Sequence, residues 1–223
     1  MADRSTEAVI FSDLGERGLM CAHAPGPLAL ARQRRVWAVA AALKDKPGVL
    51  ETIPGMNNLV VLFDPRICDA QRMRAQIEAL WQIRPEDDVT GRTIDIPVIY
   101  GGDAGPDLPD LAAHANLSIE RFVELHAGAE YTVYALGSQP GFGYLGGLPD
   151  ELATPRRTVI HPSVKAGSVI IGGAQTAVQS RTTPSGWHMI GFADVECFNV
   201  NSNPPTLLMP GDRVRFRIKE VRS

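Results

Sequence analysis

Apolar positions recur at helical and at strand spacing through the first part of the chain. A helix is predicted over residues 28–46, where apolar side chains share one face and a Pro-Gly pair follows. Two strands are predicted at 49–53 and 58–63, and the proline, glycine and asparagine between them favour an antiparallel turn. A second helix is predicted over residues 66–83. With one strand, whose residues are not located, ahead of the first helix, the order strand, helix, two strands and helix indicates most of a split βαβ, ferredoxin-like layer.

The charged, proline-containing segment 84–88 separates this pattern from a different one. We therefore expect a domain boundary there, with an α/β domain at 1–88 and a second domain at 89–223. The second pattern opens with a predicted strand at 93–100 that closes on two glycines.

Two short helices and many short strands are predicted after that first strand. The helices are expected at 108–115 and 118–127, with Ser118 as a cap and Glu120 in the first turn of the second one. From Glu130 onward, short β-type runs alternate with glycine and proline, which indicates a barrel or sandwich rather than a parallel sheet. The candidate strands lie at 131–136, 168–171, 188–191, 195–200 and 214–218.

Composition narrows the possible classes of protein. The 223 residues are 44% apolar and 21% charged, which is globular composition, and the net charge of -3 gives no reason to expect nucleic acid. No segment approaches the roughly 18 apolar residues of a membrane span, and the first residues lack the pattern of a secretory signal. The three cysteines have no metal-binding or disulfide-like spacing. We expect a cytoplasmic protein that binds neither membrane nor nucleic acid.

The glycine-rich segment 137–149 is the first candidate for chemistry. Its glycines permit left-handed backbone and close approach to a ligand, and Phe142 and Tyr144 can cover a planar or apolar substrate. A connecting loop that plugs the end of a barrel explains the same residues equally well. Arg156 and Arg157 follow a proline bend, and arginine suits carboxylate or phosphate, although two neighbours in an extended segment point to opposite sides.

A third candidate segment runs from Lys165 to Thr176. It contains no Walker A loop and no other standard nucleotide-binding pattern. Gly172 and Gly173 can present backbone N–H groups, and Gln175 can present an amide, to a ligand carbonyl; a tight turn between strands is the alternative explanation.

His126 and Glu130 form a fourth candidate, four residues apart where a helix gives way to a strand. A neighbouring carboxylate can raise the pKa of an imidazole and make it a proton shuttle, whereas a histidine satisfied by backbone is the alternative. The other histidines are too dispersed to predict a metal site, and no serine-nucleophile pattern occurs.

Several motifs, taken together and in order, are those of one known family. They are residues 96–108 (IPVIYGGDAGPDL), 126–131 (HAGAEY), 139–149, 155–157 (PRR), 166–169 (AGSV), 173–176 (GAQT), 184–187 (PSGW) and 207–212 (LLMPGD). The chain resembles the family that comprises the B subunit of 5-oxoprolinase, allophanate hydrolase subunit 1 and a sporulation-kinase inhibitor. The resemblance covers nearly the whole chain.

This resemblance implies an α+β fold, with a ferredoxin-like N-terminal domain followed by a cyclophilin-like β-barrel. It also implies partners: a C-type protein (allophanate hydrolase subunit 2) and an A-type protein. Together they convert 5-oxoproline to glutamate with ATP, and Mg accompanies ATP as co-substrate of the complex. No metal or biotin is expected to be bound by this chain itself. We expect the chain to be inactive alone.

The residues that we expect to act in this chemistry are those of the matched segments and their neighbours. The expected catalytic residues are His126, Glu130, Arg156 and Gln175. The expected substrate- or nucleotide-binding residues are Gln139, Gly141, Phe142, Tyr144, Arg157, Lys165, Gly172, Gly173, Thr176 and Trp187.

The chain departs from the family pattern at three places, which leaves the substrate open. Ala177-Val178-Gln179-Ser180 stands where members usually have Gly-Ile-Tyr-Pro, and residues 190–194 replace Ile-Gly-Arg-Thr-Pro. Lys165 also stands where a proline is usual. Two alternatives therefore stay open: a component of an allophanate hydrolase or urea carboxylase, and a non-enzymatic inhibitor of a histidine kinase. Prolyl isomerase activity is a weaker one.

Overall fold

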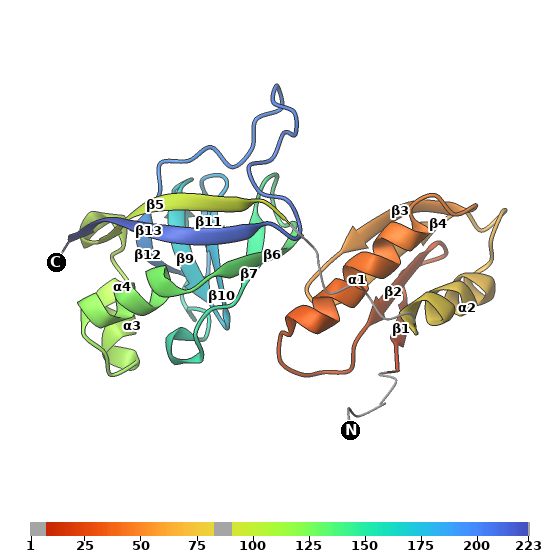
Figure 1. Cartoon of the computed structure of the whole chain (residues 1–223), viewed down its shortest axis with the longest axis horizontal. Helices are drawn as coiled ribbons and strands as arrows, with labels where there is room; N and C mark the ends of the chain where they lie inside the picture. The colour runs from red at the N-terminus through yellow and green to blue at the C-terminus, as the bar shows by residue number, and fades with distance from the viewer. Residues whose placement is uncertain (1–7, 83–90, 223) are drawn as a thin grey trace. The chain divides into compact units, whose positions relative to one another are not determined.

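The computed structural model describes residues 8–82 and 91–222 (Figure 1). The chain divides into two compact units, residues 1–89 and 90–223, which are described separately. The segment 84–88, where the sequence predicts the boundary, lies outside the described residues. None of the described helices is long and apolar enough to cross a membrane.

The first unit is a four-stranded antiparallel sheet with two helices. Its strands follow the order β1-β2-β4-β3, so β2 and β3 flank β4 as the two outer strands of a split βαβ unit. The elements are β1 (Ile10–Asp13), β2 (Gly18–Ala22), α1 (Leu30–Leu43), β3 (Val49–Pro54), β4 (Asn58–Phe63) and α2 (Ala70–Trp81). The other two strands, β1 and β2, form a hairpin that the sequence pattern did not locate.

Helices α1 and α2 cover one face of this sheet. Alternate residues of β4 point toward them, so Leu59, Val61 and Phe63 are buried, together with Ile77 and Trp81 of α2. Asp69 caps α2 by accepting a hydrogen bond from the Arg72 N–H at 2.8 Å. The predicted helices and the two predicted strands of this unit are confirmed within a few residues.

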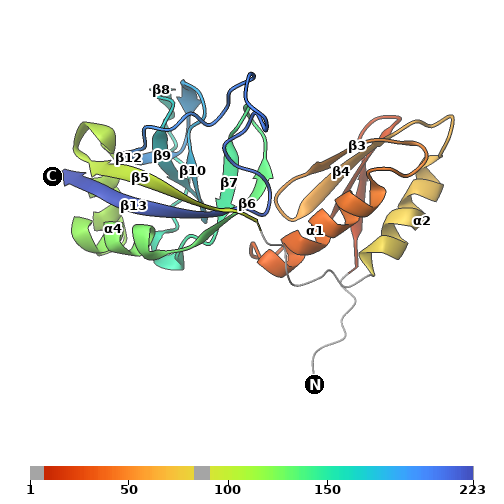
Figure 2. The ribbon, with the colours of Figure 1, turned by 45° about the horizontal axis from the view of Figure 1, so that its top comes forward.

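The second unit is a closed seven-stranded barrel in the order β10-β7-β6-β13-β5-β12-β9 (Figures 1 and 2). Strands β8 and β11 form a separate ribbon. The strands are β5 (Thr93–Gly101), β6 (Tyr131–Leu136), β7 (Gly143–Gly146), β8 (His161–Val164), β9 (Ser168–Gly172), β10 (Gln175–Val178), β11 (Thr183–Ser185), β12 (His188–Phe192) and β13 (Arg213–Arg222). The predicted α+β class with a closed barrel is confirmed.

Helices α3 (Leu108–His114) and α4 (Ile119–Gly128) pack against the barrel. Ser118 caps α4 as predicted, accepting from the Arg121 N–H at 3.2 Å. Phe122 and Val123 of α4 enter the main core of the unit. The barrel and these helices therefore share one hydrophobic interior.

The strand predicted at 195–200 is wrong. The segment between β12 and β13 is a long loop, drawn in blue in Figure 1, in which Phe198 makes an isolated bridge with Thr206. Because the barrel is closed, it offers no free edge to a further strand. Val200 accordingly remains 75% exposed.

Strands β7, β8, β10 and β11 were not predicted, since each is only three or four residues long.

The buried carboxylate of Asp212 holds the starts of β5 and β13 together. It accepts hydrogen bonds from the Arg92 N–H at 3.0 Å and from the Met209 N–H at 2.8 Å, and it pairs with the Arg92 guanidinium. Strands β5 and β13 run parallel over their whole length. Asp212 thus fixes the register at which this parallel pair begins.

We expect Asp212→Ala to lower the free energy of unfolding of the barrel by about 2–3 kcal/mol, because two backbone N–H groups lose a charged acceptor. Denaturant unfolding followed by amide exchange of the barrel strands measures this. Asp110→Ala, at an exposed position of α3, is the matched control and should change stability far less. Equal losses in the two variants would contradict the role given to Asp212.

Candidate functional site

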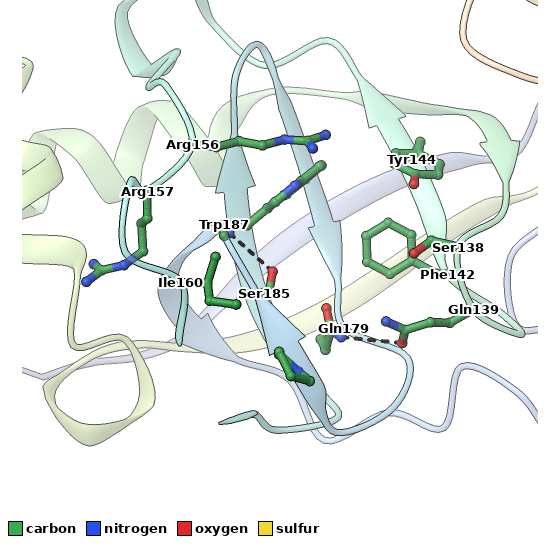
Figure 3. A pocket seen from close by; sticks show the side chains of 12 residues that line it. Ser138, Gln139, Phe142, Tyr144, Arg156, Arg157, Ile160, Gln179, Ser185 and Trp187 are labelled. Carbon is green, nitrogen blue, oxygen red and sulfur yellow. Dashed lines mark hydrogen bonds between the residues drawn. The ribbon is translucent and has the colours of Figure 1, made fainter. Parts of the chain in front are cut away.

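A cavity of about 350 Å³ opens on the outer side of the barrel (Figure 3). Its residues come from four separate parts of the second unit: β7 with the turn before it, the segment before β8, the residue after β10, and β11 with the residues after it. The lining residues are Ser138, Gln139, Phe142, Tyr144, Arg156, Arg157, Ile160, Gln179, Pro184, Ser185, Gly186 and Trp187. Six residues predicted from the sequence, Gln139, Phe142, Tyr144, Arg156, Arg157 and Trp187, therefore meet in one pocket.

Near the pocket, each barrel strand turns one face toward the core and the other toward the pocket. In β10, Thr176 and Val178 point into the barrel, whereas Ala177 packs in a separate cluster with Phe142 and Trp187. Gln179, the next residue with the orientation of Ala177, lines the pocket. The period-two alternation of a strand thus decides which residues can reach a ligand.

The glycine-rich segment makes a tight turn that presents Gln139 at the edge of the pocket. Gly137 N–H donates to the Phe142 carbonyl at 3.1 Å, and Phe142 N–H donates to the Gln139 carbonyl at 3.1 Å. Gly141 has φ +74°, and a Cβ there would lie 2.4 Å from the Cys197 carbonyl oxygen. Gly141 therefore serves the backbone path of this turn rather than touching the cavity.

Three aromatic rings form one wall of the pocket. Phe142 meets Tyr144 edge to face at 4.9 Å between ring centroids, and Trp187 lies 6.0 Å from Phe142. Gly172 of β9 makes room for the indole, since a Cβ at that position would come within 2.6 Å of Trp187. This wall suits a flat or apolar ligand surface.

The two neighbouring arginines have different partners and point in different directions (Figure 3). Arg157 donates to the buried Asp107 carboxylate at 2.7 Å and to the Val159 carbonyl at 3.1 Å. The Arg156 guanidinium lies 5.4 Å over the Trp187 ring, and among the described residues no carboxylate pairs with it. Arg156 is therefore the guanidinium that remains available to an anionic ligand.

Asp107 fixes the segment that carries these arginines. Its carboxylate accepts from Arg157, from His161 Nε2 at 2.8 Å and from the Met189 N–H at 2.7 Å. It is only 6% exposed and sits just before α3. One carboxylate thus ties the start of α3, the arginine segment and β12 together.

Two glutamines lie on the polar side of the pocket, and Ser180, which is outside the lining, contacts one of them. Gln179 Nε2 donates to the Arg181 carbonyl at 3.0 Å and to Gln139 Oε1 at 3.3 Å. Ser180 Oγ also donates to Gln139 Oε1, at 3.4 Å. Of the two positions where the sequence analysis noted a departure, Gln179 lines the pocket and Ser180 contacts a lining residue.

His126 and Glu130 do not form the pair that their spacing suggested. His126 is fully buried in the barrel core, and burial lowers its pKa to about 3, so the expected rise in pKa is wrong. Glu130 lies on the exterior, where it pairs with Arg215 at 2.6 Å. The helix ends at Gly128, and the strand that follows turns Glu130 away from the imidazole.

The hydrogen bonds around His126 fix a neutral tautomer. Thr176 Oγ1 donates its one proton to the Ile170 carbonyl at 3.0 Å, so it accepts from His126 Nε2 at 3.1 Å. His126 Nδ1 then accepts from the Tyr100 hydroxyl at 2.9 Å. His126 and Thr176 are thus a satisfied polar group inside the core, on the opposite face of β10 from the pocket.

The remaining predicted residues lie at the margin of the pocket or away from it. The Gly173 N–H is already engaged with the Thr154 carbonyl at 2.7 Å, so it is not a free donor for a ligand. Gln175 is half-buried outside the lining, and its Nε2 has no hydrogen-bond partner among the described residues. Lys165 lies over Phe192 and lines a second cavity of about 460 Å³ with Asp194 and Lys219.

Sequence reasoning missed six lining residues: Ser138, Ile160, Gln179, Pro184, Ser185 and Gly186. Gln179 had a signal, because it shares strand periodicity with Gln175, but only the structure shows which face is turned outward. Within residues 8–82 and 91–222, no group of three histidine, cysteine or acidic side chains is placed to hold a metal ion.

The chain thus combines a split βαβ unit with a closed barrel that carries a pocket on its outer side. The family described as "Carboxyltransferase domain, subdomain C and D" matches residues 9–208. Within it, the chain belongs to the family of 5-oxoprolinase B subunits. It is 45% identical over 203 residues to the 5-oxoprolinase B subunit of Escherichia coli O157:H7, covering 91% of this chain and 93% of that protein.

Other relatives and solved structures agree. The 5-oxoprolinase B subunit of Bacillus subtilis (strain 168) is 40% identical over 199 residues, 83% of each protein. The crystal structure of TTHA0988 matches with a TM-score of 0.78 and 34% identity over 92% of this chain, which spans 40% of that chain. PH0987 from Pyrococcus horikoshii matches with a TM-score of 0.57 and 32% identity over 95% and 98% of the two chains. Urea amidolyase of K. lactis, at 15% identity and a TM-score of 0.82, shares the fold, over 99% of this chain and 15% of its own.

The buried His126 predicts a pH dependence of stability. Its pKa is about 3 in the folded chain and about 6.5 when unfolded, so between these values only the unfolded chain binds the proton. Protonation then favours unfolding. We expect this group to reduce the free energy of unfolding by about 1.4 kcal/mol for each pH unit between pH 6.5 and the folded pKa of about 3, and to have no effect above pH 6.5.

Amide exchange of the barrel strands from pH 7 to pH 5 tests this expectation. In His126→Gln the free energy of unfolding should change less steeply with pH, by the equivalent of one proton. The substitution also lowers stability at every pH. His114→Gln, at an exposed position of α3, is the matched control and should keep the slope. A slope that His126→Gln leaves unchanged would be incompatible with the neutral, buried imidazole.

Proposed function

We propose that the chain acts as the B component of an ATP-dependent 5-oxoprolinase, which converts 5-oxoproline, ATP and water to glutamate, ADP and phosphate. The observation that supports it most is the outer pocket, where an unpaired guanidinium stands over an aromatic wall in a chain of this family. 5-Oxoproline is a small flat ring with one carboxylate. Its ring fits against Phe142 and Trp187, and its carboxylate fits Arg156.

The chemistry explains why ATP is consumed. A lactam is a resonance-stabilised amide, so water attacks its carbonyl carbon slowly. Transfer of the γ-phosphoryl group to the carbonyl oxygen makes that carbon electrophilic, and water can then open the ring. Such a step requires cationic and hydrogen-bonding groups at the developing charge.

Within this chain, Arg156 is the candidate for contact with the anionic part of the substrate. Arg157 acts by holding the segment through Asp107, and His126 stays neutral inside the core, so we assign neither of them to proton transfer. A cavity of about 350 Å³ with one unpaired arginine suits the lactam better than a nucleoside triphosphate. We therefore assign ATP and its Mg to the complex rather than to this pocket.

The proposal includes partner proteins and a place of action. A C-type protein and an A-type protein would complete the enzyme, and the cytoplasm, where ATP is supplied, is the expected location. The urea-side alternative has weaker support, because the urea amidolyase likeness is one of fold alone.

The proposal is tested by copurifying the chain with its C-type and A-type partners and measuring ATP-coupled turnover. We expect turnover of 5-oxoproline, with little or none of urea and allophanate, and loss of activity when this chain is left out. Turnover of urea or allophanate in place of 5-oxoproline would favour the urea-side alternative. A complete complex that turns over none of the three would overturn the proposal.

We expect Arg156→Ala to lower kcat/KM for 5-oxoproline by roughly tenfold to a hundredfold in that complex, since a charge-assisted hydrogen bond is lost. The kcat/KM of Arg156→Lys should lie between those of the wild type and Arg156→Ala, because an ammonium keeps the charge but cannot reproduce a bidentate contact. Arg121→Ala, at an exposed site of α4, is the control and should keep wild-type activity. Full activity of Arg156→Ala would remove Arg156 from the substrate contacts.

A further inference from the structure

The amide of Gln179 has an orientation that its neighbours determine. Its Nε2 faces the Arg181 carbonyl at 3.0 Å and Gln139 Oε1 at 3.3 Å. A peptide carbonyl only accepts hydrogen bonds, so the nitrogen of Gln179, and not the oxygen, stands against it. Both hydrogens of that nitrogen are used in these two contacts. The Gln179 oxygen is consequently turned to the other side.

The orientation of Gln139 follows from the same contacts. Its Oε1 accepts from Gln179 Nε2 and from Ser180 Oγ. Exchanging its oxygen and nitrogen would set two NH₂ groups against each other, which is unfavourable. Gln139 Nε2 is therefore directed away from Gln179.

The two remaining polar atoms, Gln139 Nε2 and Gln179 Oε1, are left for a ligand. Neither has a hydrogen-bond partner within the described part of the chain, and neither is sealed in by protein atoms. Both residues line the cavity, although Gln179 as a whole is only 2% exposed. In Figure 3 the two atoms lie on the side of the pair that faces Phe142 and Trp187.

We propose that this glutamine pair recognises the cis amide edge of a lactam. The proposal rests on the proposed function and names the residues that select its substrate. A lactam ring holds its N–H and its C=O side by side. The ring N–H would donate to Gln179 Oε1, while the ring carbonyl would accept from Gln139 Nε2, with the ring against the aromatic wall.

This complementarity predicts which compounds are rejected. A lactone has the same ring and carbonyl, but oxygen replaces the N–H, so it places a lone pair against the Gln179 oxygen. A prolyl amide also lacks the N–H, which speaks against prolyl isomerase activity at this pocket. The largely buried Gln179 oxygen would lose its partner in both cases, and that loss is costly.

The test uses the full chain and five-membered ring probes that lack a carboxylate, titrated by NMR. Wild-type protein should bind 2-pyrrolidone about tenfold more tightly than γ-butyrolactone. Gln179→Leu should abolish this preference. Urea carries the same edge without a ring, so it should bind more weakly than 2-pyrrolidone; tighter binding of urea would overturn the assignment to a lactam.

Gln139→Glu provides a second variant that keeps the acceptor of Gln179 Nε2 but turns the ligand-facing donor into an acceptor. We expect its preference to change from 2-pyrrolidone to 2-iminopyrrolidine, a cyclic amidinium with two N–H donors on one edge. Pyrrolidine, a cation without that edge, is the control for charge. Its affinity should increase less in Gln139→Glu than the affinity of 2-iminopyrrolidine does. Gln71→Glu, at an exposed site of α2, is the matched control and should keep the wild-type order.

Equal binding of lactam and lactone by the wild-type chain, both alone and with its partner proteins, would overturn the inference. The inference would also be overturned if Gln139→Glu still bound 2-pyrrolidone more tightly than 2-iminopyrrolidine. Because these probes need neither turnover nor Arg156, a complex that fails to open 5-oxoproline leaves this result intact. The failure of the proposed function and the failure of the lactam contact are thus separate outcomes.

Discussion

Closure of the barrel is the constraint on which the rest of the second unit depends. A ring of hydrogen-bonded strands has no edges, so each strand must turn alternate residues inward and outward. In β10 this places Thr176 against His126 in the core, and Gln179, the residue after the strand, lies in the pocket on the other side. The same rule separates Ile171, in the core, from Ile170, which packs with Trp187. Core packing and ligand contact are therefore properties of opposite sides of the same few strands.

A second constraint acts on the segment before β8. The Arg157 guanidinium reaches back fifty residues to Asp107, which also binds His161 and the backbone of β12. Arg157 is therefore held by Asp107, whereas the Arg156 guanidinium lies over the Trp187 indole. Two adjacent arginines thus differ in their surroundings, because a buried acid binds Arg157 while Arg156 lines the pocket.

Much of the fold could be predicted from local sequence, because periodicity and caps are local: the helix ends at Asp69 and Ser118 are examples. Long-range contacts could not be. His126 and Glu130 are close in sequence, yet their partners, Thr176 and Arg215, lie 50 and 85 residues away. The matched motifs contain the six pocket residues that were predicted from the sequence. Gln179 could not be predicted in this way, because the sequence does not show which face of β10 points outward.

The two-sided strands have a consequence for how such a protein changes over generations. An outward position such as Gln179 contributes to the lining of the pocket, whereas its inward neighbour Val178 contributes to the core. Evolutionary change in the pocket can therefore proceed at positions that the packing of the core does not use. Gln179, one of the positions at which the sequence analysis noted a departure from the family pattern, is such a position.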